Sequence, residues 1–270
     1  MLTSNALMIT AYATARRAPT SAEYAASAAK AADFVLGTLR AGDGRLLRTW
    51  SRGARAKLNG YLEDYAYLVE ALVAVYETTF EPRYLREAVG IAEKMIEQFW
   101  DGDGGGFFYT GRDHEPMIAR GKDPHDNATP AANSVATLAL LRLFELTGRA
   151  DLRDRAEATL RLYRDLMAER PFATAQMLLA LDFRLGPVEA FAVVGDGGEG
   201  KRILRAIHEA FRPNKVVAAK RAATGAGGVT LLEGKEAVDG QATLYVCEDF
   251  ACRAPVVGAE AAEKVLRAGA

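Results

Sequence analysis

The sequence has almost no cysteine: its 270 residues include only Cys247 and Cys252. A disulfide framework of the kind that stabilises small secreted domains is therefore excluded, and a reducing cytoplasm is the expected location. The chain also lacks an excess of charge, since 34 basic and 35 acidic residues leave a net charge of -1. Neither nucleic acid nor a membrane surface is expected as a partner. No apolar run approaches the roughly 18 residues of a membrane span, because Arg142 interrupts the best candidate, residues 135–144.

Half of the residues are apolar, and many of them recur in an internal repeat. A unit that begins near Glu23 returns sixty residues later, and a third copy follows after a further sixty-eight. The first two copies share a helical pattern and a Gly-Asp-Gly turn: Tyr24, Ala28, Ala32 and Gly42-Asp43-Gly44 match Tyr84, Ala88, Ala92 and Gly102-Asp103-Gly104. Each copy joins two amphipathic helices that cannot bury their apolar faces alone. The copies are therefore expected to stack.

Helical periodicity predicts three hairpins and a seventh helix. The predicted helices cover 5–17, 22–39, 62–78, 83–99, 132–147, 152–167 and 171–185. After Gly186 the pattern changes to that of a small α/β region, with a parallel βαβ pair at its start. Its predicted elements are strand 188–194, helix 199–211, strands 215–219, 229–232 and 242–247, and a last helix from 259. The sequence thus indicates a mostly α domain at 1–186 and an α/β domain at 187–270.

Five strings occur in the same order as in one known family. They are 2–8, 62–66, 99–101 with 105–108, 126–130 with 133–136, and 245–247 with Cys252 and 255–256. The chain resembles the C-terminal part of the spermatogenesis-associated protein 20 family, whose bacterial members are usually called thioredoxin domain-containing proteins. The resemblance implies a thioredoxin-like domain, then an α/α toroid of helical hairpins similar to six-hairpin glycosidases, then a small α/β subdomain.

The chain departs from that family in its extent. The thioredoxin-like domain with its redox motif is absent, and three hairpins plus one helix make only about half of a six-hairpin ring. The expectation is a truncated or naturally shortened version with a partial toroid. Apolar surface along the open arc would then favour self-association or binding of a missing N-terminal half.

Glu63 and Asp64 lie where a helix is predicted to begin, at the mouth of such a ring. A carboxylate pair there could act as general acid and base at the anomeric centre of a sugar. Neighbouring helical residues point about 100° apart, so only one of the two can face a pocket. Asp126 is the preferred partner from another loop, and Asp123 is among the other candidates. In the alternative interpretation both carboxylates only stabilise the positive end of the helix.

A sugar-like ligand also needs hydrogen-bonding groups and a stacking surface. The residues predicted to supply them are Tyr65, Trp100, Phe107, Arg120, Lys122, Asn127 and Asn133. The alternative is that the aromatic side chains cap the core, the charges are solvated and Asn127 caps the following helix. His114 and His125 lie in the same long loop, where proton transfer or simple surface exposure would suit them. No metal or cofactor is expected.

Four residues separate Cys247 from Cys252, which fits neither a thioredoxin CxxC motif nor a four-ligand zinc site. A strand followed by a short loop could bring the two within disulfide distance. A redox or structural pair therefore stays open beside the preferred interpretation of two separate, half-buried thiols. Acidic Glu248 and Asp249 next to the pair argue against a reactive thiolate.

Two functions stay open. The first is binding or processing of a sugar-like ligand at the mouth of the toroid, with glycosidase- or epimerase-like acid–base chemistry. The second is a non-catalytic scaffold associated with thioredoxin-type redox handling of client proteins. A pocket with two facing carboxylates and a stacking aromatic side chain favours the first. A filled mouth with an exposed cysteine pair favours the second.

Overall fold

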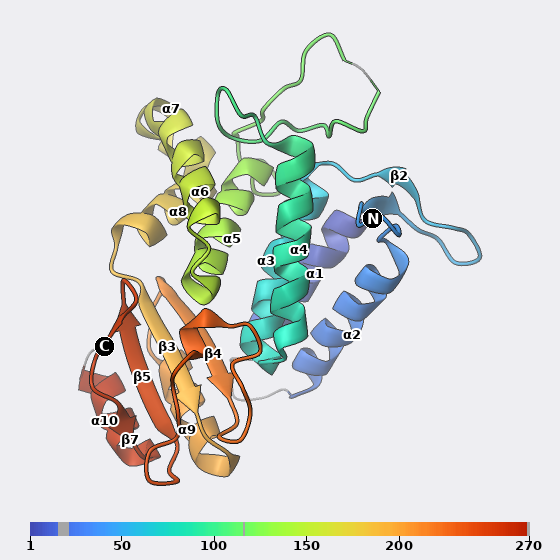
Figure 1. Cartoon of the computed structure of the whole chain (residues 1–270). Coiled ribbons are helices and arrows are strands. Elements are labelled where there is room, and N and C mark those ends of the chain that lie inside the picture. The colour runs from blue at the N-terminus through green and yellow to red at the C-terminus, as the bar shows by residue number, and fades with distance from the viewer. Residues whose placement is uncertain (16–21, 116, 269–270) are drawn as a thin grey trace. The chain divides into compact units, whose positions relative to one another are not determined.

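A computed structural model describes residues 1–15, 22–115 and 117–268 of the chain (Figure 1). Helices predominate, as predicted, and a small sheet follows them in the sequence. The chain divides into two compact units. They are Met1–Phe144 with Arg149–Asp182, here called the helical unit, and Glu145–Gly148 with Phe183–Ala270, here called the sheet unit.

Every helix predicted from periodicity is present in the structure. The bounds are α1 Leu2–Ala15, α2 Ala22–Thr38, α3 Leu62–Thr79, α4 Pro82–Phe99, α5 Ala132–Thr147, α6 Ala150–Leu162, α7 Arg164–Glu169 and α8 Ala175–Leu185, with a 3₁₀ turn η1 at Pro171–Thr174. The helix predicted over 152–167 is divided at Tyr163 into α6 and α7. The predicted end of the first helix, residues 16 and 17, lies outside the described residues. Within the described ranges, no helix combines the length and hydropathy needed to cross a bilayer.

α3 forms the centre of the core of the helical unit. Fourteen of its 18 residues are buried, as expected for a helix in which apolar residues predominate around most of the circumference. α1 packs along it, and hydrogen bonds mark both ends of the contact. Thr3 N donates to Asp64 (3.1 Å) at the start of α3, and Thr78 Oγ1 donates to Ala13 O (3.0 Å) near its end. α4, which is amphipathic, also packs on α3, so a largely buried helix is paired with an amphipathic one, as the hairpin prediction requires.

The internal repeat is also visible in the backbone of the two long loops. After α2, Leu47 N donates to Leu39 O (2.7 Å), and after α4, Phe108 N donates to Phe99 O (2.9 Å). Antiparallel bridges occur at corresponding positions, Arg40 with Leu46 and Trp100 with Phe107. Each loop therefore returns along the end of the preceding helix, α2 or α4, before the next hairpin starts. The first loop continues into a two-stranded ribbon of β1 (Leu47–Thr49) and β2 (Lys57–Asn59).

The sheet unit has the strand order β4-β3-β5-β6, with β7 paired to β5. The bounds are β3 Glu189–Val194, α9 Gly197–Glu209, β4 Lys215–Lys220, η2 Thr230–Leu232, β5 Thr243–Glu248, β6 Ala251–Cys252, β7 Val256–Val257 and α10 Ala259–Ala268. β3 and β4 are parallel and joined through α9, which confirms the predicted βαβ pair. The predicted strand at 229–232 is wrong, because these residues form the 3₁₀ turn η2, in which Leu232 N donates to Val229 O (2.9 Å). Four apolar residues are too few for periodicity to separate a strand from a buried turn.

Glu145, in the last turn of α5, makes the stability of the sheet unit depend on pH. Burial raises the pKa of its carboxyl to about 7, the charge of Asp249 raises it further and Arg184 opposes the shift. An unfolded glutamate has a pKa of about 4.3, so the stabilisation is complete below that pH and is lost as the pH rises through 7. After allowance for partial exposure, we expect the free energy of unfolding to fall by about 1–2 kcal/mol between about pH 5 and pH 8. Urea unfolding of the wild type and Glu145→Gln at both pH values measures this slope, which the variant should lack.

Glu209→Gln provides the matched control, because this side chain is exposed at the end of α9. The control should keep the wild-type dependence on pH. A wild-type slope in Glu145→Gln would show that other groups cause it.

Candidate functional site at the starts of α3 and α5

Asp64 joins the starts of α1 and α3. Its side chain is fully buried and accepts hydrogen bonds from Tyr61 N (3.0 Å), Thr3 N (3.1 Å), Thr3 Oγ1 and Arg48 Nη1 (2.8 Å). The bond from Tyr61 N belongs to a capping box at the start of α3. Because helix N-termini carry unpaired N–H groups and positive partial charge, a carboxylate shared by α1 and α3 stabilises both. The carboxylate oxygens of Asp64 are thus engaged within the fold.

Glu63, one residue earlier, faces a cavity that Asp64 does not line. The two directions differ as expected for adjacent residues of a helix. The Glu63 side chain is 20% exposed and pairs with Arg48 Nη2 at 2.7 Å. A single guanidinium, carried by β1, therefore holds both carboxylates in place. The same guanidinium lies 4.9 Å from the centre of the Tyr61 ring.

The cavity has a volume of about 160 Å³. One wall is the start of α3 together with Tyr109, and the other is the loop that leads into α5, with the first residues of that helix. The polar residues that line it are Glu63, Asp123, His125, Asn127, Thr129 and Asn133. The predicted catalytic residue Glu63 and the predicted ligand-binding residues Asn127 and Asn133 are thus brought to one place.

Asp123 and His125 lie at the solvent side of this cavity. Asp123 Oδ1 accepts a hydrogen bond from His125 N (3.1 Å) and lies 3.6 Å from His125 Nδ1. The two side chains are 61% and 43% exposed, respectively. Asp123 is therefore the carboxylate that shares the cavity with Glu63. Among the described residues, no group of three or more His, Cys, Asp or Glu side chains is placed to hold a metal ion.

Asp126, the preferred partner in the sequence analysis, is used by the backbone. Its Oδ1 accepts from Ala131 N (2.7 Å), just before α5, and its Oδ2 accepts from Gln176 N (2.8 Å), in the first turn of α8. It does not line the cavity. Asp126 therefore does for α5 and α8 what Asp64 does for α1 and α3: it ties two helix starts together.

Asn133 and Tyr65 occupy corresponding places in successive copies of the repeat. Tyr65 Oη accepts a hydrogen bond from Leu46 N (2.9 Å), and Asn133 Oδ1 accepts one from Phe107 N (2.8 Å). Asn133 Nδ2 also donates to Phe107 O (2.9 Å). Tyr65 is 1% exposed, and burial raises the pKa of its phenol to about 12. Its ring therefore belongs to the core and offers no face to a ligand, whereas Asn133 contributes to the cavity wall.

The other predicted stacking residues also pack inside the helical unit. Phe107 is fully buried. Trp100 is half-buried and meets the Phe107 ring edge-on, with 5.0 Å between ring centres. Neither lines the cavity. These aromatic residues cap the core, which was the alternative interpretation of the sequence.

Arg120 and Lys122 stabilise the loop that follows α4. Arg120 donates to the carbonyl of Thr110 and lies 4.3 Å from the centre of the Phe108 ring. Lys122 Nζ donates to Asp101 Oδ2 (2.6 Å) and to a backbone carbonyl, and this lowers the pKa of Asp101 to about 2. Neither cation lines the cavity. Both side chains stabilise the conformation of the loop and are not in a position to contact a ligand in the cavity.

Tyr109 is the aromatic residue that does line the cavity, and the sequence analysis did not select it. Its ring stacks on Tyr61 with 5.0 Å between centres and an angle of 24°. Its carbonyl accepts a hydrogen bond from Leu62 N (3.1 Å), at the start of α3. The His114 ring also packs on the Tyr61 ring, with 4.8 Å between their centres. Tyr109 is therefore held rigidly beside Glu63.

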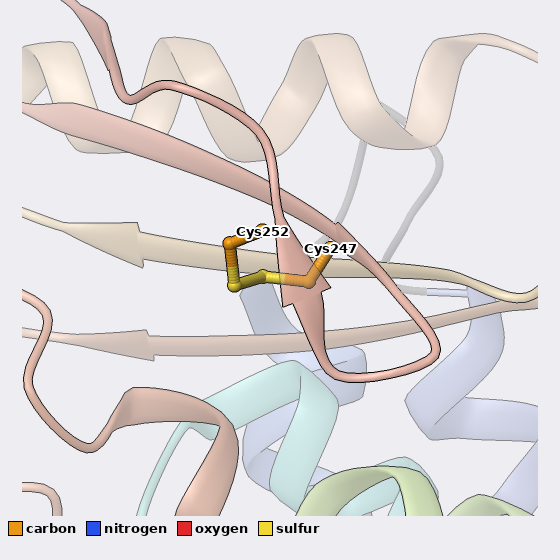
Figure 2. The surroundings of a disulfide bond; sticks show 2 residues. All are labelled: Cys247 and Cys252. Carbon is orange, nitrogen blue, oxygen red and sulfur yellow. A yellow bond between two sulfur atoms is a disulfide. The ribbon is translucent and has the colours of Figure 1, made fainter.

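The two cysteines form a disulfide, so the interpretation as two separate half-buried thiols is wrong. Cys247 in β5 lies directly opposite Cys252 in β6, with 3.9 Å between Cα atoms (Figure 2). Cys247 is 1% exposed, and Cys252 is exposed. A stable disulfide is unusual in a reducing cytoplasm. The inference of location from cysteine usage therefore loses its support, and a cytoplasmic location stays a prediction.

No family model matches the chain. It is 31% identical to spermatogenesis-associated protein 20 of Homo sapiens over 226 residues. The aligned region covers 79% of this chain and 29% of the human protein. The Mus musculus protein of the same name is 29% identical over 266 residues, or 93% of this chain and 34% of that protein. The chain belongs to the spermatogenesis-associated protein 20 family. It spans about a third of the length of these curated relatives.

An uncharacterized protein of Caenorhabditis elegans is 27% identical over 281 residues, or 98% of this chain and 37% of that protein. The relatives named spermatogenesis-associated protein 20 confirm the family that the five strings indicated. In this member of the spermatogenesis-associated protein 20 family, the string 62–66 forms the first turn of α3, and the strings 126–130 and 133–136 contribute Asn127, Thr129, Pro130 and Asn133 to the opposite wall of the cavity. Two family strings thus build one site.

Proposed function

We propose that the cavity between the starts of α3 and α5 binds a single sugar-like ring and that Glu63 transfers a proton to or from it. The observation that carries the proposal is that Glu63 and Asp123 line one cavity together with the rigid aromatic ring of Tyr109. Sugar sites combine an aromatic surface for the apolar face of the ring with polar groups for its hydroxyls. Asn127 and Thr129 supply such polar groups on the opposite wall.

The size of the cavity supports a small ligand. Drug-sized ligands occupy pockets of about 300–1,000 Å³, and this cavity measures about 160 Å³. A monosaccharide ring is the matching size class, and an oligosaccharide would have to extend out of the cavity. The solvent side, at Asp123 and His125, is where such an extension would emerge.

The proposal includes a partial α/α toroid of the six-hairpin glycosidase type. Its support is the pairwise joining of inner-helix starts, of α1 to α3 through Asp64 and of α5 to α8 through Asp126. In such a ring the N-terminal ends of the helices that line the inside surround the mouth. Glycosidase- or epimerase-like chemistry would use Glu63 with Asp123 or His125 as its second proton-transfer group, in place of Asp126.

Replacement of Glu63 by glutamine tests this proposal. The amide keeps the size of the side chain and can still bond to Arg48, but it cannot transfer a proton. We expect a monosaccharide or amino sugar from a thermal-shift screen to stabilise both proteins and any turnover of that compound to fall by about 10²-fold or more in the variant. Glu97→Gln, which removes an exposed carboxylate on α4, is the matched control and should behave as the wild type.

Two further variants separate binding from chemistry. Tyr109→Ala and Asn127→Ala should each weaken binding of the same compound without affecting folding of the sheet unit. A screen in which no sugar, amino sugar or sugar phosphate shifts the melting temperature would argue against the proposal. Equal turnover in the wild type and Glu63→Gln would argue against the role of Glu63.

The second candidate function is a non-catalytic scaffold associated with thioredoxin-type redox handling. The observation that favours it is the Cys247–Cys252 disulfide, whose second cysteine is exposed. If the cavity binds no compound and the disulfide reacts with dithiols, this second function is the better description of the chain.

A further inference from the structure

The disulfide lies at the tip of a very short hairpin. β6 contains only two residues and is the last strand of the sheet order β4-β3-β5-β6. Asp249 and Phe250 form the two-residue turn between β5 and β6, with φ of 47° and 63°. Both values lie in the left-handed region expected of a type I′ turn, which glycine and asparagine prefer and a bulky side chain such as Phe250 rarely adopts. The turn is therefore held in a conformation that its sequence does not favour.

The two sulfur atoms belong to residues of opposite exposure. Cys247 is 1% exposed within β5, whereas Cys252 is exposed on the edge strand β6. A thiolate from solution can therefore approach the Cys252 side of the bond. Exposed disulfides are the ones that exchange readily, in contrast to buried structural ones.

We propose that Cys247–Cys252 is a reversible two-electron redox site, opened by a dithiol that attacks the sulfur of Cys252. A thiolate of the dithiol forms a bond to Cys252 Sγ, the Cys247–Cys252 bond breaks, and Cys247 leaves as a thiolate that takes a proton from water. In the mixed disulfide, the second thiolate of the dithiol then attacks the dithiol sulfur that is bonded to Cys252. Cys252 leaves and is protonated, so the protein gains two electrons and two protons and the dithiol becomes a disulfide.

The rest of the sheet unit does not depend on this bond. β5 pairs with β3 at five positions, from Ala190 opposite Cys247 to Val194 opposite Thr243. The disulfide closes a loop of only a few residues, and short loops give small entropic stabilisation. Reduction therefore releases the Asp249-Phe250 turn and β6 while the β3–β5 pairing persists. This separation makes the step reversible.

The charges around the pair select the reductant. Glu248 and Asp249 flank Cys247 on its turn side, and Arg253 Nη2 lies 3.9 Å from Glu248 Oε2. Negative charge repels the thiolate of glutathione, which also carries two carboxylates, more than it repels the thiolate of a dithiol that has no other charge. A dithiol that is neutral or carried on a basic protein surface is therefore the class of partner that fits.

The test uses the oxidised full chain with dithiothreitol and with glutathione as separate probes. Free thiols are trapped by alkylation and counted by mass. We expect dithiothreitol to release both thiols together under native conditions, with the far-ultraviolet circular dichroism retained, and reoxidation to restore the starting mass. Glutathione at the same thiol concentration should act at least tenfold more slowly. A disulfide that opens only when the protein is unfolded would overturn the proposal.

The direction of attack is tested in the wild type and in two single variants. A limiting amount of 2-mercaptoethanol should leave its adduct on Cys252 of the wild type, as mapped by peptide mass. Cys252 in Cys247→Ser should react with a neutral aromatic disulfide at least tenfold faster than Cys247 in Cys252→Ser. An adduct on Cys247, or equal rates in two folded variants, would contradict attack at Cys252.

Discussion

Replacing Asp64 with alanine is expected to destabilise the helical unit by about 3–5 kcal/mol. The change leaves Thr3 N and Tyr61 N without their acceptor in the core, and it removes the fully buried carboxylate that neutralises Arg48. Since α1 is tied to α3 through this group, we also expect α1 to detach before the rest of the unit unfolds. Urea unfolding followed by circular dichroism measures the loss of unfolding free energy. Hydrogen exchange of the α1 amides shows whether α1 detaches before the rest of the unit unfolds.

Glu63→Ala is the matched control for this prediction. It removes a neighbouring carboxylate that also pairs with Arg48, but one that is partly exposed. The free energy of unfolding should fall by only about 0–1 kcal/mol in this variant, the contribution of an accessible ion pair. Similar losses in the two variants would mean that Arg48, rather than the joining of helix starts, determines the stability here.

Replacing Asp126 with alanine is expected to cost about 2–3 kcal/mol, the sum of two lost helix-start hydrogen bonds. Ala131, one of the two donors, lies five residues from Asp126 in the sequence, and Gln176, the other, lies fifty residues from it. The cavity should lose its shape as well, because the loop that leads into α5 forms one of its walls. Thermal unfolding and binding of the ligand identified in the screen measure both effects.

Asp123→Ala separates folding from function at the same loop. Its carboxylate is largely exposed at the solvent side of the cavity, so the stability should change by less than about 0.5 kcal/mol. Ligand binding or turnover should still decrease. If Asp126→Ala were as stable as Asp123→Ala, the helix-joining role of Asp126 would be incorrect.

The hairpins can be predicted from the sequence because an apolar stripe along a helix is a local pattern. Its recurrence sixty residues later doubles the evidence for each element. The division between α6 and α7 at Tyr163 leaves no comparable signal, since the apolar spacing continues through it. The 3₁₀ turn at 230–232 is missed for the opposite reason, because its few apolar residues resemble a strand.

The cavity can be predicted only in part. A carboxylate pair after Asn59-Gly60 indicates a helix start, but the direction of each side chain depends on partners from distant segments. Thr3 and Arg48 bind Asp64, and no local pattern reveals that pairing. The same holds for the aromatic residues: Phe107 and Tyr109 alternate along one short segment, and only the packing decides which of them reaches the cavity.

The shared position of Tyr65 and Asn133 bears on how such a repeat can diversify. A phenol in one copy and a carboxamide in the next both accept the loop amide that precedes their helix. The position therefore requires a side-chain oxygen that can accept a hydrogen bond from the loop amide. It tolerates a large change in the volume and polarity of the side chain. Asn133, the smaller residue, lines the cavity, whereas Tyr65, the larger one, fills the corresponding space in the core. The same hydrogen bond to the loop is thus kept in both copies while the space beside it differs.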